Sequence, residues 1–338
     1  MIKVAINGFG RIGRRVFRLA LNHSTIKIVS INDLADARTL SHLLKYDSVH
    51  GVLKEDISYS DKGILVNGKL VPLSNQKDIS KIDWLTSKPD IVIEATGKFK
   101  QKEQLQHHIK NGASYVILSV PPLDDTIKTI VLGVNDDSID GNERILSNAS
   151  CTTNNAAPMI DIMHKNFGVK QAYITTVHSY TTDQSLHDQP HRDLRRARAA
   201  GQSIVPTTTG AAKALTKIFP DLADVIGGCG IRVPVPNGSL TDITFNVEKE
   251  VDIATINTVF KNASKGYLKG ILQYTVDSIV SIDIVGNTNS CVFDSQMTSV
   301  IGNMVKIIGW YDNETAYSQR LLDLTCNLSI KNVLLSNK

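Results

Sequence analysis

The hydrophobic pattern of the first half of the chain is typical of a parallel sheet covered on both faces. Short apolar runs rich in Val and Ile alternate with helical stretches, and these runs lie at residues 3–6, 26–31, 90–94, 115–118 and 129–133. Strands that are buried on both faces read as nearly continuous apolar runs, and strands that alternate with helices indicate β-α-β units. We therefore expect an α/β domain of the Rossmann type, with a doubly wound parallel sheet.

The second half of the chain follows a different pattern. Its apolar runs are longer and alternate with polar positions, at residues 172–180, 240–248, 278–285 and 304–311. Such alternation is typical of a mostly antiparallel sheet with one packed face. The second half is therefore expected to form an α+β domain.

The end of the chain predicts one more helix. Residues 317–328 carry apolar positions spaced for one helical face, at Leu321, Leu322, Leu324 and Leu328. A length of 338 residues also exceeds the roughly 150 residues expected of one domain. We predict a first domain over residues 1–150, a second over 151–316, and a segment over 317–338 whose helix packs back on the first domain.

Composition and charge narrow the function classes. The fractions of hydrophobic residues, 42%, and of charged residues, 21%, are those of a globular protein. The net charge is only +4, and Lys and Arg are spread along the chain apart from one cluster at residues 192–198. A general nucleic-acid-binding protein would carry a broad basic face, and apolar runs stay below the roughly 18 residues that suggest a membrane span. We therefore expect no dedicated nucleic-acid or membrane binding.

The cysteines indicate the cellular compartment. Cys151, Cys229, Cys291 and Cys326 are far apart and form no CxxC pair, which argues against a zinc site or a disulfide framework. Free thiols fit a reducing cytosol, and the start, MIKVAINGFG, goes directly into a strand and a glycine turn. The sequence predicts a cytoplasmic protein without a metal.

A glycine-rich turn is the first feature that carries chemistry. Gly8, Gly10 and Gly13 form a GxGxxG between a strand and a helix, which allows a tight turn and lets the backbone approach a pyrophosphate. Asp33 ends the next strand, where a carboxylate can bind an adenosine ribose and would repel a ribose phosphate. NAD is favoured over NADP, while a purely structural turn and a strand-end Asp remain the alternatives.

Cys151 lies in SNASCTTNNAAPM, between a strand-like run and the start of a helix. Backbone N–H groups and the positive end of the helix dipole would stabilise a thiolate there, and the same donors could hold an oxyanion. The setting indicates a nucleophile. A cysteine among small residues is otherwise a packing residue, and the other three cysteines are interpreted in that way, without polar neighbours.

His178 ends a strand-like run in VHSYTTDQ. A thiol that attacks an aldehyde needs a base, and an imidazole suits this role near pH 7. A single histidine is more often structural, so His178 is the candidate base only in combination with Cys151. His107 and His108 are expected on a solvated helix.

Several runs, in order along nearly the entire chain, resemble the sequence motifs of one family, the bacterial-like phosphorylating glyceraldehyde-3-phosphate dehydrogenases. These runs are GFGRIGR, SNASCTTN, HSYTTDQ, DLRRARAA, PTTTGAAKAL, RVPVPNGSLTD and GWYDNE. The resemblance implies a homotetramer of two-domain subunits. Each subunit would oxidise glyceraldehyde 3-phosphate with NAD and inorganic phosphate to 1,3-bisphosphoglycerate, a step of glycolysis.

The resemblance also implies roles for individual residues. Cys151 would be the nucleophile and His178 its base, and the thioester on Cys151 would keep the acyl group activated for attack by phosphate. The substrate phosphate would lie at Thr181 and Arg232. The inorganic phosphate would lie at Ser150, Thr152, Arg196, Thr209 and Gly210. Arginine forks and hydroxyl groups suit both anions.

Further cofactor contacts follow from the same resemblance. The additional positions are Arg11, Ile12, Thr96, Ser119, Asn313 and Tyr317. Asn313 would fix the nicotinamide carboxamide and hence the ring face that receives the hydride, although a turn residue in YDNE is the alternative.

The chain departs from the family pattern at two informative positions. Asn155 replaces the second cysteine common in CTTNC, which removes a possible disulfide partner of Cys151 but no acid, base or phosphate ligand. Gln189 replaces a leucine often seen in NAD-preferring bacterial members, and it leaves the preference for NAD over NADP partly open.

Three alternative functions are compatible with the sequence. An erythrose-4-phosphate dehydrogenase would use the same cysteine and histidine, although Thr181, Thr209 and Gly210 favour the triose substrate. A biosynthetic enzyme would run toward triose phosphate with NADPH. A non-catalytic NAD-binding interaction protein could keep the glycine turn, but it would have no need of Cys151 and His178.

Overall fold

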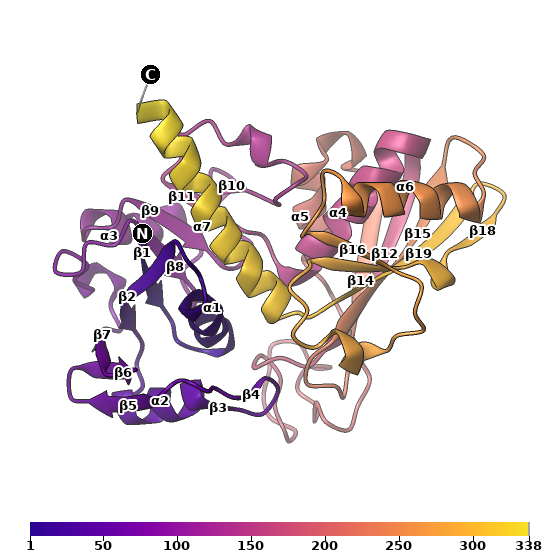
Figure 1. Ribbon diagram of the computed structural model, residues 1–338. Helices are drawn as coiled ribbons and strands as arrows, with labels where there is room; N and C mark the ends of the chain where they lie inside the picture. Colours follow the sequence, from indigo (N-terminus) through magenta and orange to yellow (C-terminus); the bar gives the residue numbers. More distant parts are fainter. Residues whose placement is uncertain (337–338) are drawn as a thin grey trace. The chain divides into compact units, whose positions relative to one another are not determined.

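Residues 1–336 are described by the structure, a computed structural model (Figure 1). The chain divides into two units. Unit 1 comprises Met1–Ile130, Asp137–Ala149 and Ser318–Lys338, and unit 2 comprises Val131–Asp136 and Ser150–Tyr317. The short stretch Val131–Asp136 was not indicated by the hydrophobic pattern. Residues 337 and 338 of the predicted terminal segment lie outside the described residues.

Unit 1 is built on a nine-stranded sheet with the order β10-β11-β9-β8-β1-β2-β7-β6-β5. Its strands are β1 (Ile2–Asn7), β2 (Ile26–Asn32), β5 (Ile57–Ser60), β6 (Gly63–Val66), β7 (Lys69–Ser74), β8 (Ile91–Glu94), β9 (Tyr115–Leu118), β10 (Lys128–Thr129) and β11 (Ile145–Ser147). All neighbours from β10 to β7 pair in parallel, whereas β5, β6 and β7 form an antiparallel edge. The chain runs outward from β1 in both directions, so that β1 and β8 form the switch point at which doubly wound sheets bind ligands.

Unit 1 also contains helices. They are α1 (Arg11–Leu21), α2 (Ala37–Lys45), α3 (Lys102–Lys110), the 3-10 helix η1 (Ile79–Lys81) and, from Ser318 onward, α7 (Thr315–Ser336). A 3-10 turn, η2 (Asp136–Ser138), and a small hairpin of β3 (Tyr46–Asp47) and β4 (Gly51–Val52) complete the elements. α1 packs on β2, α2 on β5 and β6, and α3 on β9 and β11. Fully buried strand residues such as Val4, Ile6 and Val92 each stabilise the fold by about 1.5–3 kcal/mol.

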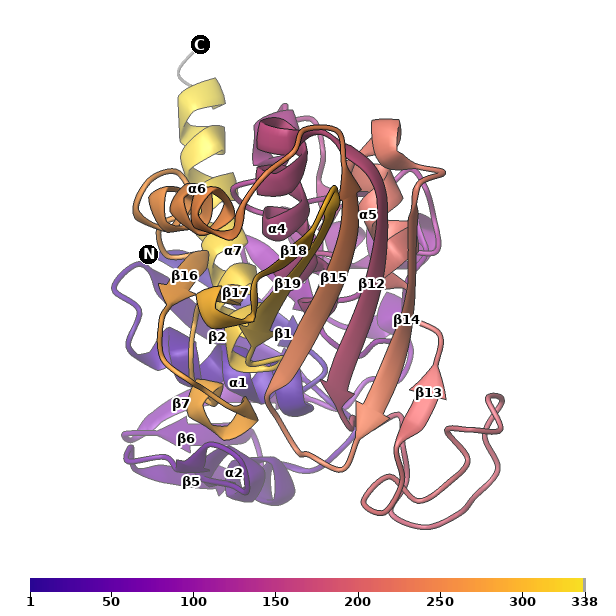
Figure 2. The same cartoon turned by 90° about the vertical axis from the view of Figure 1, so that its right-hand side faces the viewer.

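Unit 2 contains a second, mostly antiparallel sheet with the order β13-β14-β12-β15-β19-β17-β16. Its strands are β12 (Val169–Ser179), β13 (Val205–Thr207), β14 (Ile226–Val233), β15 (Ser239–Val247), β16 (Leu272–Thr275), β17 (Cys291–Asp294), β18 (Ser299–Ile301) and β19 (Met304–Tyr311). Its helices are α4 (Cys151–Phe167), α5 (Ala211–Ile218), α6 (Ile253–Lys265), and the 3-10 helices η3 (Pro220–Leu222), η4 (Ser281–Ile284) and η5 (Ser295–Met297). Figure 2 shows α4 and α5 behind this sheet, with the opposite face turned to the viewer, and α6 packs on β16 and α4. The alternation predicted from the sequence results from this one-sided cover.

Two predicted strands are wrong. The predicted strand 278–285 contains the 3-10 turn η4 in place of a strand. The Asp283 carboxylate accepts a hydrogen bond from the backbone N–H of Val280 at 2.8 Å. The side chains of Val280 and Ile282 are 57% and 70% exposed. The predicted strand 129–133 continues β10 only as far as Thr129. Its later backbone is diverted because Asn135 Oδ1 accepts the N–H of Val131 at 2.8 Å. In both places a side chain close in sequence takes the hydrogen bond that a strand would need.

Candidate functional site

The glycine turn of unit 1 connects β1 to α1. Gly8 has φ +94°, and a Cβ there would lie 2.7 Å from the backbone nitrogen of Thr96. Gly13 lies against the carbonyl of Gly8, which leaves no room for a side chain. Gly10, which caps α1, faces open space. Packing therefore explains Gly8 and Gly13 but not Gly10, whose open side leaves room for a pyrophosphate at the helix N-terminus.

The other predicted cofactor contacts of unit 1 include residues at neighbouring strand ends. Asp33 follows β2, and its Oδ2 accepts the N–H of Phe9 at 2.6 Å while Oδ1 accepts that of Ala35 at 3.0 Å. Asp33 thus fastens the glycine turn, and each carboxylate oxygen keeps a lone pair for a ribose hydroxyl. Thr96 and Ser119 follow β8 and β9. The structure therefore brings these residues to one edge of the sheet.

Arg11 and Ile12 open helix α1. The Arg11 guanidinium is held by Asp47, with Nη1–Oδ2 at 2.7 Å and Nη2–Oδ1 at 3.1 Å. Burial favours a raised pKa of Asp47, but the backbone N–H groups of His50 and Val49 and the Arg11 charge together lower this pKa from 3.8 to about 2. The predicted phosphate contacts of Arg11 and Ile12 are thus available from backbone N–H groups, which lack intrahelical partners at a helix start.

We expect the variant Asp47→Asn to lower the free energy of unfolding at neutral pH. The folded-state pKa of Asp47 is depressed, so the carboxylate stabilises the fold fully above about 3.8, and this contribution is lost as the pH falls through about 2. Urea unfolding of the wild type and the variant between pH 7 and pH 3 measures the difference. A difference that stays constant or widens on acidification would contradict the assignment.

Cys151 and His178 are brought together in unit 2. Cys151 is the first residue of α4, and His178 lies near the end of β12. Cys151 Sγ lies 3.4 Å from His178 Nε2. The helix begins there because Ser150 Oγ accepts the backbone N–H of Thr153 at 3.1 Å. The N–H groups of Cys151 and Thr152 precede the first intrahelical hydrogen bond, so they can serve an oxyanion.

Arg232 is the closest charged neighbour of His178. The parallel register of β12 and β14 pairs His178 with Arg232. Arg232 Nη1 lies 2.6 Å from His178 Nδ1. The same Nη1 donates a hydrogen bond to the carbonyl oxygen of Ser179 at 2.9 Å. His178 Nδ1 also lies 2.7 Å from this carbonyl oxygen. A guanidinium can only donate and a carbonyl can only accept, so the imidazole tautomer decides whether Nδ1 accepts from Arg232 or donates to the carbonyl of Ser179.

Burial dominates the charge states of the pair. It raises the pKa of the Cys151 thiol, against the charge of Arg232 and hydrogen bonds from Thr152. Burial also lowers the pKa of His178 to about 3, and the charges of Arg232 and Arg196 add to this effect. The pair is therefore a neutral thiol and a neutral imidazole, which differs from the expected thiolate because desolvation outweighs the helix start.

A buried tyrosine links the two elements of the pair, and the sequence analysis missed it. Tyr311 Oη lies 2.9 Å from Thr152 Oγ1 and 2.9 Å from Thr176 Oγ1, so it joins α4 to β12. Its ring lies edge-on to the His178 ring, with centroids 5.9 Å apart. The Thr152 hydroxyl thus points to Tyr311, and a phosphate contact of Thr152 would come from its backbone N–H. Nothing in the sequence near Tyr311 signalled this contact.

The remaining phosphate residues gather at the start of α5. Arg196 Nε donates to Thr207 Oγ1 at 2.9 Å, Nη2 donates to the carbonyl of Thr208 at 3.2 Å, and Nη1 pairs with Asp183. Thr209 Oγ1 accepts the N–H of Ala211 at 3.2 Å, and Gly210 caps the helix. Thr181 lies half-buried in the turn after β12. Arg196 is thus held by the residues that precede Thr209.

The predicted nicotinamide contacts also belong to unit 2. Asn313 Oδ1 accepts hydrogen bonds from Ser179 Oγ at 2.8 Å and from Ser239 Oγ at 2.9 Å. These two serines, which the sequence analysis missed, orient the amide so that its Nδ2 is the group left to serve a ligand. Tyr317 is buried, and burial raises its pKa well above 10.0.

Several smaller expectations are corrected by the structure. Cys229 lies 3.8 Å from Thr175 Oγ1, and Cys326 lies 3.9 Å from His23 Nε2, so both have polar neighbours. The sequence predicts a solvated His108, but its side chain is fully buried, because it lies on the face of α3 that packs on the sheet. Asn155, which departs from the family pattern, is buried. Its Nδ2 donates hydrogen bonds to the carbonyl oxygens of Ser290 and Trp310, each at 3.2 Å, and thereby ties α4 to the sheet.

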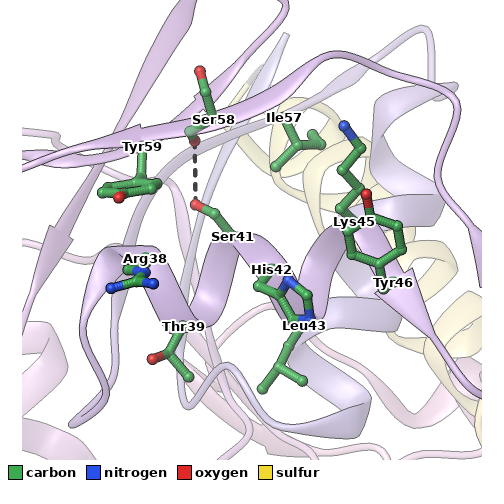
Figure 3. A pocket seen from close by; sticks show the side chains of 10 residues that line it. All are labelled: Arg38, Thr39, Ser41, His42, Leu43, Lys45, Tyr46, Ile57, Ser58 and Tyr59. Atoms are coloured by element: carbon green, nitrogen blue, oxygen red, sulfur yellow. Dashed lines mark hydrogen bonds between the residues drawn. The ribbon is translucent and has the colours of Figure 1, made fainter.

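A hollow of about 650 Å³ lies between α2 and β5 (Figure 3). Its wall includes Tyr46 and Tyr59, and Ser41 Oγ donates to the carbonyl of Ser58 at 3.2 Å across it. Its lining includes none of the predicted site residues, so the hollow is separate from the site.

Residues 1–336 contain neither a candidate metal site nor a candidate membrane-spanning helix. In that range, three or more His, Cys, Asp or Glu side chains do not come together in a way that could hold a metal ion. The helices of the same range are too short or too polar to cross a membrane.

Comparison with known proteins gives consistent matches over the chain. Residues 2–102 match the family model "Glyceraldehyde 3-phosphate dehydrogenase, NAD binding domain", and residues 150–313 match that of the C-terminal domain. The chain is 48% identical over 332 residues to a glyceraldehyde-3-phosphate dehydrogenase of Geobacillus stearothermophilus, covering 98% of this chain and 99% of the relative. It is 50% identical over 327 residues to glyceraldehyde-3-phosphate dehydrogenase 2 of Streptomyces avermitilis, covering 96% and 97%. With both domains matched and the cysteine–histidine pair in place, the chain belongs to the glyceraldehyde-3-phosphate dehydrogenase family.

Proposed function

We propose that this protein oxidises glyceraldehyde 3-phosphate with NAD and inorganic phosphate to 1,3-bisphosphoglycerate, through a thioester on Cys151. The observation that carries this proposal is the 3.4 Å contact between Cys151 Sγ and His178 Nε2 at the start of α4. Membership of the family and its NAD-binding domain support the choice of substrate and cofactor. We assign residues 1–150 to cofactor binding, residues 151–316 to catalysis, and residues 317–338 to a helix that packs on the first domain.

The first step is attack of the thiol on the aldehyde. His178 Nε2 takes the thiol proton as Sγ bonds to the carbonyl carbon, which gives a hemithioacetal. The developing oxyanion lies near the backbone N–H of Cys151 and the protonated imidazole, which both stabilise it. The imidazolium then gives its proton to this oxygen, which forms the hemithioacetal hydroxyl group and leaves His178 neutral again. The low pKa of His178 in the unliganded protein keeps the imidazole neutral, and Nε2 can accept the thiol proton when the ring proton is on Nδ1.

The oxidation step uses the same imidazole. NAD, when bound, accepts the hydride from the hemithioacetal carbon. His178 accepts the hydroxyl proton, and the carbon becomes the carbonyl of a thioester. Inorganic phosphate then attacks this carbonyl, and Cys151 leaves as the thiolate, which takes back a proton. The residues that would bind this phosphate are Ser150, Thr152, Arg196, Thr209 and Gly210.

Arg232 connects substrate binding to the base. When Arg232 donates to Nδ1, the His178 proton lies on Nε2, and this nitrogen then has no lone pair to accept the thiol proton. A substrate phosphate held by Arg232 and Thr181 would draw the guanidinium away from Nδ1. Nδ1–H could then donate to the carbonyl of Ser179, 2.7 Å away, which frees the Nε2 lone pair. The base would thus be prepared when the substrate is bound.

Assembly and location are also proposed here. We propose the homotetramer that the family resemblance implies. The exposed apolar residues Tyr173 and Met304 line one hollow on the unit 2 sheet, and exposed apolar patches are typical of subunit contacts. We propose a cytoplasmic location, because Cys151 must remain a free thiol to react. Asp33 favours NAD, and the exposed Gln189 leaves some use of NADP to be measured.

We expect NADH to form from glyceraldehyde 3-phosphate and NAD only slowly without inorganic phosphate, and rapidly with it. The measurement is absorbance of NADH with purified protein, repeated with erythrose 4-phosphate and with NADP. Preference for erythrose 4-phosphate or for NADP would move the assignment to the respective alternative enzyme. Absence of activity with every pair would favour an NAD-binding interaction protein.

A further inference from the structure

A row of buried polar side chains lies beneath the glycine turn of unit 1. Its members are Asn7, Asn32, Glu94, His108 and Trp84, and none is more than 3% exposed. Buried polar groups are costly unless their hydrogen bonds are made, and an apolar core would serve stability as well. Stability alone therefore does not explain why this polar row lies in an apolar sheet interior, and its position in the sheet must be considered.

The row crosses three neighbouring strands at one height. The sheet register pairs Asn7 of β1 with Asn32 of β2 on one side and with Glu94 of β8 on the other. Asn7 Nδ2 donates to Glu94 Oε2 at 2.5 Å, and Asn32 Nδ2 donates to Asn7 Oδ1 at 2.8 Å. The side chains thus tie the three strand ends together on both sides of the switch point.

Helix α3 fixes the orientation of Glu94. The Nε1–H of Trp84, which can only donate, contacts His108 Nδ1 at 2.9 Å. His108 therefore carries its proton on Nε2, which donates to Glu94 Oε2 at 3.0 Å. The other oxygen, Oε1, accepts the N–H of Thr96 at 2.9 Å and also the Thr96 hydroxyl. Both oxygens of the carboxylate are thus held by directed donors.

Each strand member of the row stands one or two residues before a residue assigned to the cofactor. Asn7 precedes Gly8, Asn32 precedes Asp33, and Glu94 stands two residues before Thr96 and bonds to it. Gly8 also packs against the backbone of Thr96. The spacing between the glycine turn, the ribose carboxylate and Thr96 is therefore set by the row.

We infer that Glu94, oriented by His108 and Trp84, is a positioning residue for the adenosine half of NAD. It acts by holding the Thr96 backbone at a fixed distance from the glycine turn and does not itself touch the cofactor. This inference rests on the proposed assignment of Gly8, Asp33 and Thr96 to NAD binding. Such a residue contributes to affinity by preorganising the binding edge.

The test compares variants of the full-length protein by calorimetric titration with NAD. Glu94→Gln puts an amide NH₂ against groups that are donors, so one contact is lost whichever way the amide turns. We expect its dissociation constant for NAD to rise by roughly 10-fold or more, and its KM for NAD to rise more than its KM for the aldehyde. His108→Gln keeps a donor toward Glu94 and loses the acceptor of Trp84, so we expect a smaller rise. This second variant also serves if Glu94→Gln fails to fold.

The matched control is Val116→Ala, which creates a cavity at a fully buried apolar position of the same sheet. An equal rise of the NAD dissociation constant in this control, at an equal loss of melting temperature, would overturn the inference. So would a folded Glu94→Gln variant that binds NAD as tightly as the wild type. Failure of the wild type to bind NAD is a different result, because it would overturn the proposed function as well.

Discussion

Replacing Cys151 with serine should abolish phosphate-dependent NADH formation, with a loss of roughly 10⁴-fold or more in kcat/KM. A serine hydroxyl is a much weaker nucleophile than a thiol, and the single imidazole beside it is neutral. An oxygen ester would also hold the acyl group in a less activated form than a thioester. The measurement is NADH formation from glyceraldehyde 3-phosphate with and without inorganic phosphate.

Cys229→Ser is the matched control for this variant. Cys229 is also a free cysteine of unit 2, but it lies on β14 beside Thr175 and away from His178. We expect this control to keep wild-type activity. Activity of Cys151→Ser within 10-fold of the wild type, or an equal loss in Cys229→Ser, would contradict the assignment of Cys151 as the nucleophile.

The second large effect is expected from His178→Asn, with a loss of about 10²–10⁴-fold in kcat/KM. Asparagine retains a polar side chain but cannot accept the proton of the thiol or of the hemithioacetal hydroxyl. The surface variant His164→Asn, on the same helix as Cys151 and paired with Asp221 at 2.8 Å, should keep its activity. Equal losses in both histidine variants would indicate a general effect on folding in place of base catalysis.

The same variant should change the pH dependence of stability. Because the pKa of His178 falls from 6.5 to about 3 on folding, the unfolded chain binds a proton between these values and the folded chain does not. Wild-type stability therefore carries a penalty that is absent above pH 6.5 and grows as the pH falls toward 3. Urea unfolding should show His178→Asn gaining stability relative to the wild type on acidification. A constant difference would exclude the depressed pKa.

The cofactor turn shows how far local sequence reaches. Gly8, Gly10 and Gly13 could be predicted from spacing alone to form a strand–helix turn, because the turn and the helix contact both lie within one strand–helix junction. Cys151 was similarly visible at a helix start. By contrast, the strand predicted at residues 278–285 was wrong, because alternation of apolar residues does not show whether a partner strand is available.

What the sequence alone determined is the family, the two kinds of sheet, and the candidate site residues at strand and helix ends. These features depend on short-range periodicity and on motifs of a few residues. Only the tertiary structure decided which distant groups meet: Arg232 reaches His178 because two strands pair in register 54 residues apart, and His108 is buried against Glu94 because α3 turns that face to the sheet. Burial and long-range pairing set the protonation states of these groups, and neither is encoded in the residues next to them along the chain.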